Sequence, residues 1–245
     1  MYDIKIDSFS FSSYKNIVID KVEGFSPPSS TISRTKLGKD GTSFTGSTRN
    51  ERNIVINFSI LNNVKNTREV LYNNIITGNE VTVTVNSLRK ITGYIESFEL
   101  NNFQQITTGQ ISIICPDPYF YSLSPKRVHF YNSSSVTINA PNDECDFIIR
   151  VDFSAVSNEF EFDYYSISGI TITQHRFYIT NEFKTNDTLI IDSANRKITV
   201  NGINKYSSKN WITWPKLKKG NNKWSITASN INSGYIEISE KYFAI

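Results

Sequence analysis

Apolar and polar residues alternate along most of the chain. Residues 54–60 read Ile-Val-Ile-Asn-Phe-Ser-Ile, with an apolar side chain at every second position, and residues 81–85 repeat the pattern in a shorter, β-branched form. A period of two is the spacing of a strand with one buried face. Residues 91–100 and 110–115 have the same character, and we predict that they form a hairpin across the polar stretch 101–109.

A single segment in this half of the chain has helical spacing. Asn66 is placed to cap a helix, Glu69 follows three residues later as in a capping box, and Gly78 is placed to end it. Between them, apolar residues recur four positions apart and form one stripe. We predict a helix near 67–77 that lies across the sheet.

A change in composition divides the chain. Pro116 and Pro118 stand one residue apart, where neither suits the interior of a sheet, and a serine-rich run follows at 132–135. We place the boundary near Lys126, which gives domains 1–126 and 127–245. Short strands separated by turn residues favour a β-sandwich in the second domain; they are predicted at 159–165, 176–179, 188–192, 197–202, 224–227 and 235–238.

Composition narrows the class of protein. Aromatic residues make up 13% of the 245 residues, which excludes a disordered chain, and a formal charge of +3 is too small for a dedicated nucleic-acid binder. The first residues alternate charged and apolar side chains, unlike a signal peptide, and no apolar run is long enough to span a membrane. We expect a soluble globular protein with two reduced thiols, Cys115 and Cys145, since neither has CxxC spacing.

Motifs for catalysis, cofactor binding and metal binding are missing from the sequence. There is no phosphate-binding glycine loop and no GxSxG motif, and His129 and His175 are isolated. Glu159, Glu161 and Asp163 are close enough to suggest paired carboxylates, but strand alternation places them on an exposed face as ordinary surface acids. We therefore predict no catalytic, cofactor-binding or metal-binding residues, and a hydrolase using these acids is the weakest hypothesis.

Two groups of residues are candidates for binding. The first is a basic segment that forms either a contact loop for a partner or a solvated loop; it contains Arg34, Lys36, Lys39, Arg49 and Arg52. The second is the tryptophan group Trp211, Trp214 and Trp224, which has lysines nearby. Its rings suit either stacking against sugars or a place in the core or an interface. If the rings stack against sugars, the alternative function of the protein is a carbohydrate-binding module that contacts the host cell wall.

Four blocks in order along the chain resemble the distal tail protein (Dit) family of long-tailed bacteriophages. The first runs from Val22-Glu23-Gly24 through the glycine turn at 38–42 to the arginine-led strand 49–56. The second is the helical segment 68–78, and the third is the hairpin that ends in Cys115-Pro116-Asp117-Pro118-Tyr119-Phe120-Tyr121. The fourth comprises three segments, which are residues 185–192, 197–202 and 217–222.

The resemblance implies a structural protein and not an enzyme. It implies a mainly β fold, in which an N-terminal β-sandwich or split-barrel-like domain with one α-helix precedes a galectin-like, carbohydrate-binding-module-like β-sandwich. Copies of the first domain would form a hexameric ring at the distal end of the virion tail, after synthesis in the host cytoplasm. The implied partners are the tail tube protein, a tail-associated lysin or tail-spike protein, and receptor-binding or other baseplate proteins. DNA would pass through the channel, and no membrane is involved.

Overall fold

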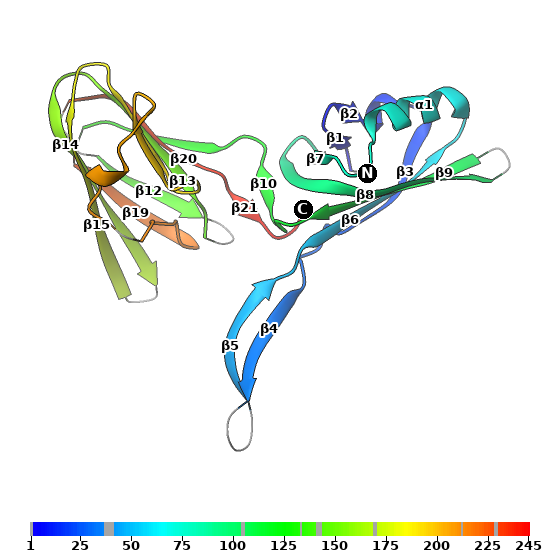
Figure 1. The fold of residues 1–245 in the computed structure, drawn as a ribbon, viewed down its shortest axis with the longest axis horizontal. Helices are drawn as coiled ribbons and strands as arrows, with labels where there is room; N and C mark the ends of the chain where they lie inside the picture. Colours follow the sequence, from blue (N-terminus) through cyan, green and yellow to red (C-terminus); the bar gives the residue numbers. More distant parts are fainter. Residues whose placement is uncertain are drawn as a thin grey trace. The chain divides into compact units, whose positions relative to one another are not determined.

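The computed structural model describes residues 2–36, 42–103, 106–132, 134–140, 144–168, 171–211, 213–227 and 230–245. The predicted mainly β fold with one α-helix is confirmed for this part of the chain (Figure 1). The chain forms two compact units, residues 1–123 with 242–245, and residues 124–241. The sequence placed the division at 126/127 and gave no sign that the last four residues return to the first unit.

The first unit is built on a nine-stranded antiparallel sheet. Seven of its strands follow the order β2-β1-β7-β8-β9-β6-β3, while β10 pairs with both β8 and β21. The strands are β1 (Ile4–Ile6), β2 (Phe9–Ser10), β3 (Ile17–Glu23), β6 (Arg52–Ile60), β7 (Glu80–Val85), β8 (Arg89–Phe103), β9 (Ile106–Cys115), β10 (Phe120–Ser122) and β21 (Lys241–Tyr242). A 3-10 turn, η1 (Phe11–Ser13), joins β2 to β3.

The hairpin of β8 and β9 is longer than predicted. The expected connection at 101–109 is wrong, because the two strands remain paired through Asn101 opposite Thr108 and Phe103 opposite Ile106. Ladder hydrogen bonds come from the backbone, so polar side chains do not end a strand when the backbone of its partner continues beside it. The predicted strands at 54–60 and 81–85 are confirmed as β6 and β7.

The helix α1 (Val64–Asn74) begins three residues earlier than predicted and ends sooner. Its N-cap is Asn63, in the left-handed region at φ 50°, and Thr67 is buried in the first turn, where its Oγ1 donates to the Asn63 carbonyl at 3.0 Å. The predicted cap at Asn66 is therefore wrong. Gly78 lies beyond the helix at φ +85° and donates its N–H to the Ile95 carbonyl, so it shapes the turn into β7.

Leu71 and Ile75 hold α1 against the sheet. They are 0% and 3% exposed, whereas Tyr72 and Ile76, which the same spacing had included in the apolar stripe, are 51% and 50% exposed. Leu71 and Tyr72 lie in α1, while Ile75 and Ile76 lie just beyond its end, so the predicted stripe is divided between two core residues and two exposed ones.

A separate two-stranded sheet interrupts this unit between β3 and β6. It consists of β4 (Ser30–Lys36) and β5 (Thr42–Arg49), which pair only with each other among the described residues. Residues 30–33 are all exposed, and Ile32 is 52% exposed. We call residues 30–49 the arm, which Figure 1 draws clear of the nine-stranded sheet. Residues 37–41 of the predicted turn lie outside the described residues.

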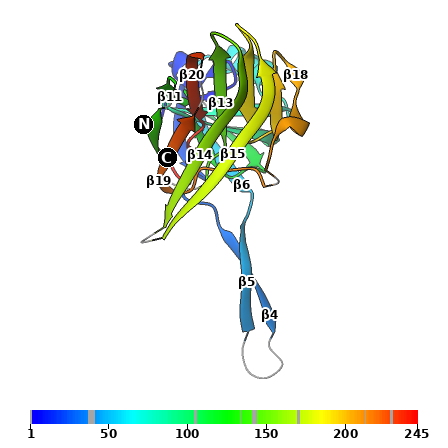
Figure 2. The same ribbon diagram turned by 90° about the vertical axis from the view of Figure 1, so that its left-hand side faces the viewer.

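The second unit is a β-sandwich, as its spacing of short strands predicted. Its six-stranded sheet has the order β11-β20-β13-β16-β17-β18, and its four-stranded sheet has the order β12-β19-β14-β15 (Figure 2). The strands are β11 (Lys126–Phe130), β12 (Ser135–Ala140), β13 (Phe147–Phe153), β14 (Ser157–Ser168), β15 (Thr171–Phe183), β16 (Thr188–Asp192), β17 (Lys197–Val200), β18 (Ile203–Asn204), β19 (Gly220–Thr227) and β20 (Ile231–Ile238). A 3-10 turn, η2 (Tyr206–Ser208), precedes β19.

Aromatic rings cover glycines in both units. Phe58 lies opposite Gly109 across β6 and β9, and Phe130 lies opposite Gly234 across β11 and β20. A Cβ atom on Gly234 would lie 2.3 Å from the Phe130 ring, and one on Gly109 would lie 2.2 Å from the Phe58 ring. Each ring therefore occupies the space of the missing side chain, a pairing that also fixes strand register.

We expect Gly234→Ala to lower the free energy of unfolding by about 1–3 kcal/mol, because Phe130 is buried and must move to admit the methyl group. Urea unfolding followed by circular dichroism would measure the change. Ser233→Ala, one residue away, is a poor control because Ser233 bonds Asp152, whereas Ser225→Ala on β19 changes no residue of this pair. A Gly234→Ala variant as stable as the parent would contradict the assigned packing.

Candidate functional site

The residues of the predicted basic contact loop have different environments. Arg34 and Lys36 lie in β4, but their side chains, like Lys39, lie outside the described residues. Arg49 is exposed at the end of β5, with its guanidinium carbon 4.0 Å from the centroid of the Phe243 ring. Arg52 is only 3% exposed, so its placement on an exposed loop is a wrong prediction.

Arg52 is instead a buried link between distant parts of the first unit. Its Nε donates to the Pro118 carbonyl at 2.7 Å, and Nη1 donates to the carbonyls of Gly24 and, at 2.7 Å, Ser26. Its Nη2 donates to the Phe243 carbonyl at 2.6 Å. Burial lowers the pKa of Arg52 from its usual value, yet a guanidinium stays protonated throughout the range in which proteins fold. One cation thus satisfies four backbone carbonyls.

A second arginine holds the same C-terminal segment. Arg89 donates to the Ala244 carbonyl, and its guanidinium carbon lies 3.9 Å from the centroid of the Tyr242 ring. Residues 242–245 are therefore fastened to the sheet by Arg52 and Arg89. Sequence patterns did not predict this role. The block ending at Tyr121 is connected to it only through Pro118, whose carbonyl accepts a hydrogen bond from Arg52.

Both cysteines are buried thiols that are not joined by a disulfide. Burial raises the pKa of the Cys115 thiol to about 12, from a usual value of 9.0. The predicted reduced thiols thus occupy core positions, where a neutral sulfur is favoured.

This shift has a consequence for stability at high pH. Because folding raises the pKa of Cys115, the unfolded thiol ionises at a lower pH than the folded one. The stability that the neutral thiol contributes is therefore complete below about pH 9 and is lost as the pH rises from about 9 towards about 12. Urea unfolding at pH 8 and pH 10 should show this loss in the parent and a smaller loss in Cys115→Ala. An equal loss of unfolding free energy between pH 8 and pH 10 in the two proteins would contradict this assignment to Cys115.

The three tryptophans do not form one surface. Trp224 is 0% exposed and stacks on Phe162 with ring centroids 5.3 Å apart, so it belongs to the sandwich core and its assignment to a carbohydrate surface is wrong. Trp211 is 6% exposed, and Trp214 is partly buried with its ring edge-on to Trp211 at 5.8 Å. Only Trp214 keeps a substantial accessible part.

Trp211 and Trp214 line a groove in the second unit. The groove has a volume of about 950 Å³, which is within the size range of small-molecule sites. Its walls come from the segment before β13, strands β14 and β15, the turn between β16 and β17, and the segment 210–218. Both sheets of the sandwich therefore take part, and the sequence alone could not bring these segments together.

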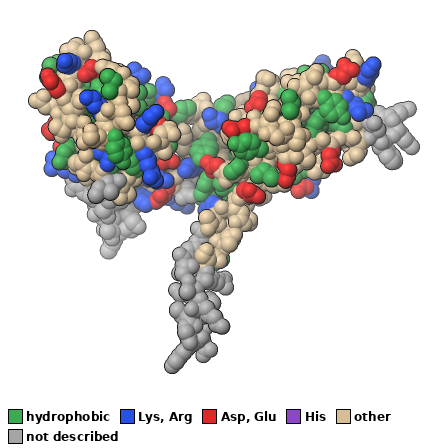
Figure 3. Space-filling model, in the orientation of Figure 1, with side chains coloured by type: hydrophobic (Ala, Val, Ile, Leu, Met, Phe, Trp, Pro, Cys, Tyr) green, Lys and Arg blue, Asp and Glu red, His purple; other side chains and the backbone are tan. Residues whose placement is uncertain are grey.

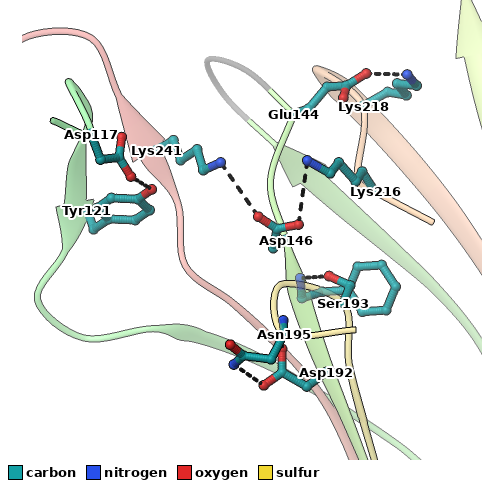
Figure 4. A network of polar contacts seen from close by, with 11 residues as sticks. Asp117, Tyr121, Glu144, Asp146, Asp192, Ser193, Asn195, Lys216, Lys218 and Lys241 are labelled. Carbon is teal, nitrogen blue, oxygen red and sulfur yellow. Dashed lines mark hydrogen bonds and ion pairs between the residues drawn. The ribbon is translucent and has the colours of Figure 1, made fainter. Parts of the chain in front are cut away.

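Charged side chains of both signs meet at the groove. Asp146 lies 3.9 Å from the ammonium of Lys216 and 3.6 Å from that of Lys241, and Glu144 is paired with Lys218 (Figure 4). On the face shown in Figure 3, basic and acidic side chains are intermixed. The carboxylates at the groove are therefore engaged by lysines.

The remaining candidates for chemistry have ordinary surroundings. Glu161 is paired with Arg176 at 2.5 Å across β14 and β15. His129 is exposed on β11, and the side chain of His175 lies outside the described residues. Within the described ranges, no three His, Cys, Asp or Glu residues are grouped as a metal site would require. In the same ranges no helix is long and apolar enough to cross a membrane.

Comparisons with known proteins agree with this architecture. Residues 142–242 match the family model described as siphovirus-type tail component, C-terminal domain. The crystal structure of the Dit protein of phage SPP1 superimposes with a TM-score of 0.78 at 17% identity, covering 99% of each chain. The second unit thus matches this tail-component family, and the whole chain has the fold of a Dit protein. That family consists of siphovirus tail components, so the predicted resemblance to the Dit family and the prediction of a protein that is not an enzyme are confirmed.

A second solved structure has the same fold with less similarity. A chain of the baseplate of phage P2, in its activated conformation with calcium, covers 100% of this chain and of its own length at a TM-score of 0.53 and 8% identity. No curated protein sequence matches the chain. Like the Dit structure, the baseplate chain extends the similarity of fold over both units.

Proposed function

We propose that this protein is the hub at the distal end of a phage tail, where it assembles as a hexameric ring. The observation that carries the proposal is the fold, which follows the SPP1 Dit structure over 99% of both chains. That structure is described as a paradigm of the hub adsorption apparatus in phages that infect Gram-positive bacteria. The family match in the second unit supports the same function.

The first unit has the features of a subunit that completes itself in an assembly. Its arm is a two-stranded sheet, and such a sheet is marginal in water by itself. Large apolar side chains are half exposed on and beside α1 at Leu61, Tyr72 and Ile76. A closed ring joins two different patches of each subunit, so an arm on one and an apolar face on the next are suitable complements. In this proposal Arg34, Lys36, Lys39 and Arg49 contact the neighbouring subunit.

The ring would lie between the tail tube and the tail tip. One face would contact the tail tube protein and the other a tail-associated lysin or tail-spike protein, with DNA passing through the channel. The second unit would be available to receptor-binding or other baseplate proteins. The similarity to the fold of a phage P2 baseplate chain supports this position.

Mass measurement and imaging test the hexamer directly. Mass photometry across a concentration series should give a particle of six times the 28.0 kDa chain, and negative-stain images should show sixfold rings. Addition of the tail tube protein should stabilise the ring at concentrations where the free protein dissociates. A chain that remains monomeric at every concentration, alone and with tail tube protein, would overturn the proposal.

A carbohydrate-binding function of the second unit is the second candidate. The groove beside Trp214 favours it.

A further inference from the structure

We propose that the groove of the second unit binds a saccharide unit bearing an acidic group. Its volume of about 950 Å³ admits a ligand of that size, and aromatic, amide and guanidinium side chains all line it. Three groups do the binding in this proposal: the ring of Trp214, the amide of Asn210 and the guanidinium of Arg196.

Trp214 supplies a fixed aromatic wall. Its ring is held edge-on by Trp211 at 5.8 Å and lies 6.1 Å from the ring of Tyr206. Trp211 is in turn supported by Phe177, with ring centroids 5.3 Å apart. A ring held from two sides loses little conformational freedom when a ligand packs against it. The apolar C–H face of a sugar ring is a suitable partner for such a surface.

Asn210 supplies an oriented hydrogen-bond donor. Its Oδ1 accepts the Tyr178 N–H at 2.8 Å, and its own N–H donates to the Tyr178 carbonyl at 3.2 Å. These two bonds fix the side chain against β15 while its NH₂ group has no acceptor among the described residues. Sugar hydroxyl oxygens are acceptors for an amide of this kind.

Buried polar groups of the groove wall add further hydrogen-bonding capacity. Ser193 is 3% exposed, and its Oγ accepts the Phe147 N–H at 2.8 Å, which leaves the hydroxyl hydrogen to donate. The indole N–H of Trp211, a residue that is 6% exposed, has no acceptor among the described residues. A ligand rich in hydroxyl groups matches these donors better than an apolar ligand would.

Arg196 decides the charge of the ligand. It lies in the turn between β16 and β17 at φ 52°, and Asp192 shapes that turn by accepting the Asn195 N–H at 3.0 Å and its Nδ2 at 2.8 Å (Figure 4). Lys216 and Lys218 at the groove are paired with acids, and Arg176 is paired with Glu161. Arg196 is exposed and has no carboxylate partner within the described part of the chain. Its guanidinium is therefore available for a carboxylate or a phosphate.

The experiment titrates the full-length protein with oligosaccharides and follows tryptophan fluorescence and calorimetric heat. The probes are a uronic acid oligosaccharide, a sugar phosphate oligomer and a neutral maltooligosaccharide. At least one acidic probe should bind, and the neutral probe should bind about tenfold more weakly or worse. Whichever acidic probe binds more tightly identifies the acidic group as carboxylate or phosphate.

Variants locate the binding site. Arg196→Ala and Trp214→Ala should each weaken binding of the acidic probe about tenfold or more, and Trp214→Phe, which keeps an aromatic ring, should lose less. Lys184→Ala and Tyr131→Ala are matched controls, since each removes an exposed cation or aromatic residue of the same unit outside the groove. Circular dichroism would show that each variant is folded.

Several outcomes would overturn the proposal. They are flat titrations with both acidic probes, equal binding of the neutral probe, equal binding of inorganic phosphate alone, and unchanged affinity in both Arg196→Ala and Trp214→Ala. Ring assembly is measured separately by particle mass, so failure of saccharide binding leaves the hub proposal standing, and failure of the ring leaves this one standing.

Discussion

Removal of the arm is expected to leave the protein monomeric. Ser29 and Asn50 flank the arm and are joined by a backbone hydrogen bond from the Asn50 N–H to the Ser29 carbonyl at 3.0 Å, so a two-residue Asn-Gly turn is a suitable replacement for residues 30–49. Among the described residues, the arm pairs with no strand of the nine-stranded sheet, but its removal also removes the contact of Arg49 with the Phe243 ring. We therefore expect the variant to unfold only slightly below the parental temperature. Its loss should nevertheless prevent ring closure, because each subunit then lacks one of two complementary surfaces.

Mass photometry of the arm variant beside the parent measures this effect. Ile32→Asp, which places a charge at the exposed apolar residue of the arm, should weaken assembly without abolishing it. Lys184→Ala, an exposed change in the second unit, controls for the general effect of altering surface charge. Rings of parental mass in the arm variant would show that assembly uses other surfaces.

Arg52→Met should be the most destabilising single change in the first unit. Methionine retains the apolar stem but leaves the carbonyls of Gly24, Ser26, Pro118 and Phe243 without their shared donor. Loss of several buried bonds to a charged group is expected to lower the free energy of unfolding by about 3 kcal/mol or more. Chemical denaturation followed by circular dichroism gives the value.

Two further variants sharpen the result. Arg52→Lys keeps the charge but cannot direct donors to four separate carbonyls, so most of the loss should remain. Lys65→Met, an exposed change of similar size on α1, should alter stability by no more than about 0.5 kcal/mol. A loss below about 1 kcal/mol in Arg52→Met would mean that water replaces the guanidinium at little cost.

The alternation of apolar and polar residues predicted the strands, because a strand that buries one face has an apolar residue at every second position. This is why β6, β7 and six of the ten described sandwich strands were found, whereas β11, β12, β13 and β18 were not predicted. The ends of elements depended on tertiary partners. The sequence does not distinguish Thr67 from an ordinary polar residue. In the structure its Oγ1 donates to the Asn63 carbonyl and accepts from Asn16, and these contacts fix the first turn of α1. Likewise, β8 and β9 continue through polar residues because each supports the backbone of the other.

The roles of single side chains were harder to predict than the fold. Arg49 and Arg52 are close in the sequence, and both were predicted to be surface cations. Arg52 is instead buried and donates hydrogen bonds to four backbone carbonyls. Trp211, Trp214 and Trp224 look equivalent in the sequence, but strand register places Trp224 in the core. The groove needed the segment before β13, strands β14 and β15, the turn between β16 and β17 and the segment before β19, whose convergence no local spacing encodes.

The return of residues 242–245 to the first unit makes the second unit an insertion. The chain leaves the first unit after β10 and comes back through β21, and these two strands are hydrogen-bonded neighbours in one sheet. Domains inserted between adjacent points of a host fold are readily exchanged, because the host needs only that the two connections stay close. Such a module can be replaced during evolution while the fold of the first unit is inherited unchanged.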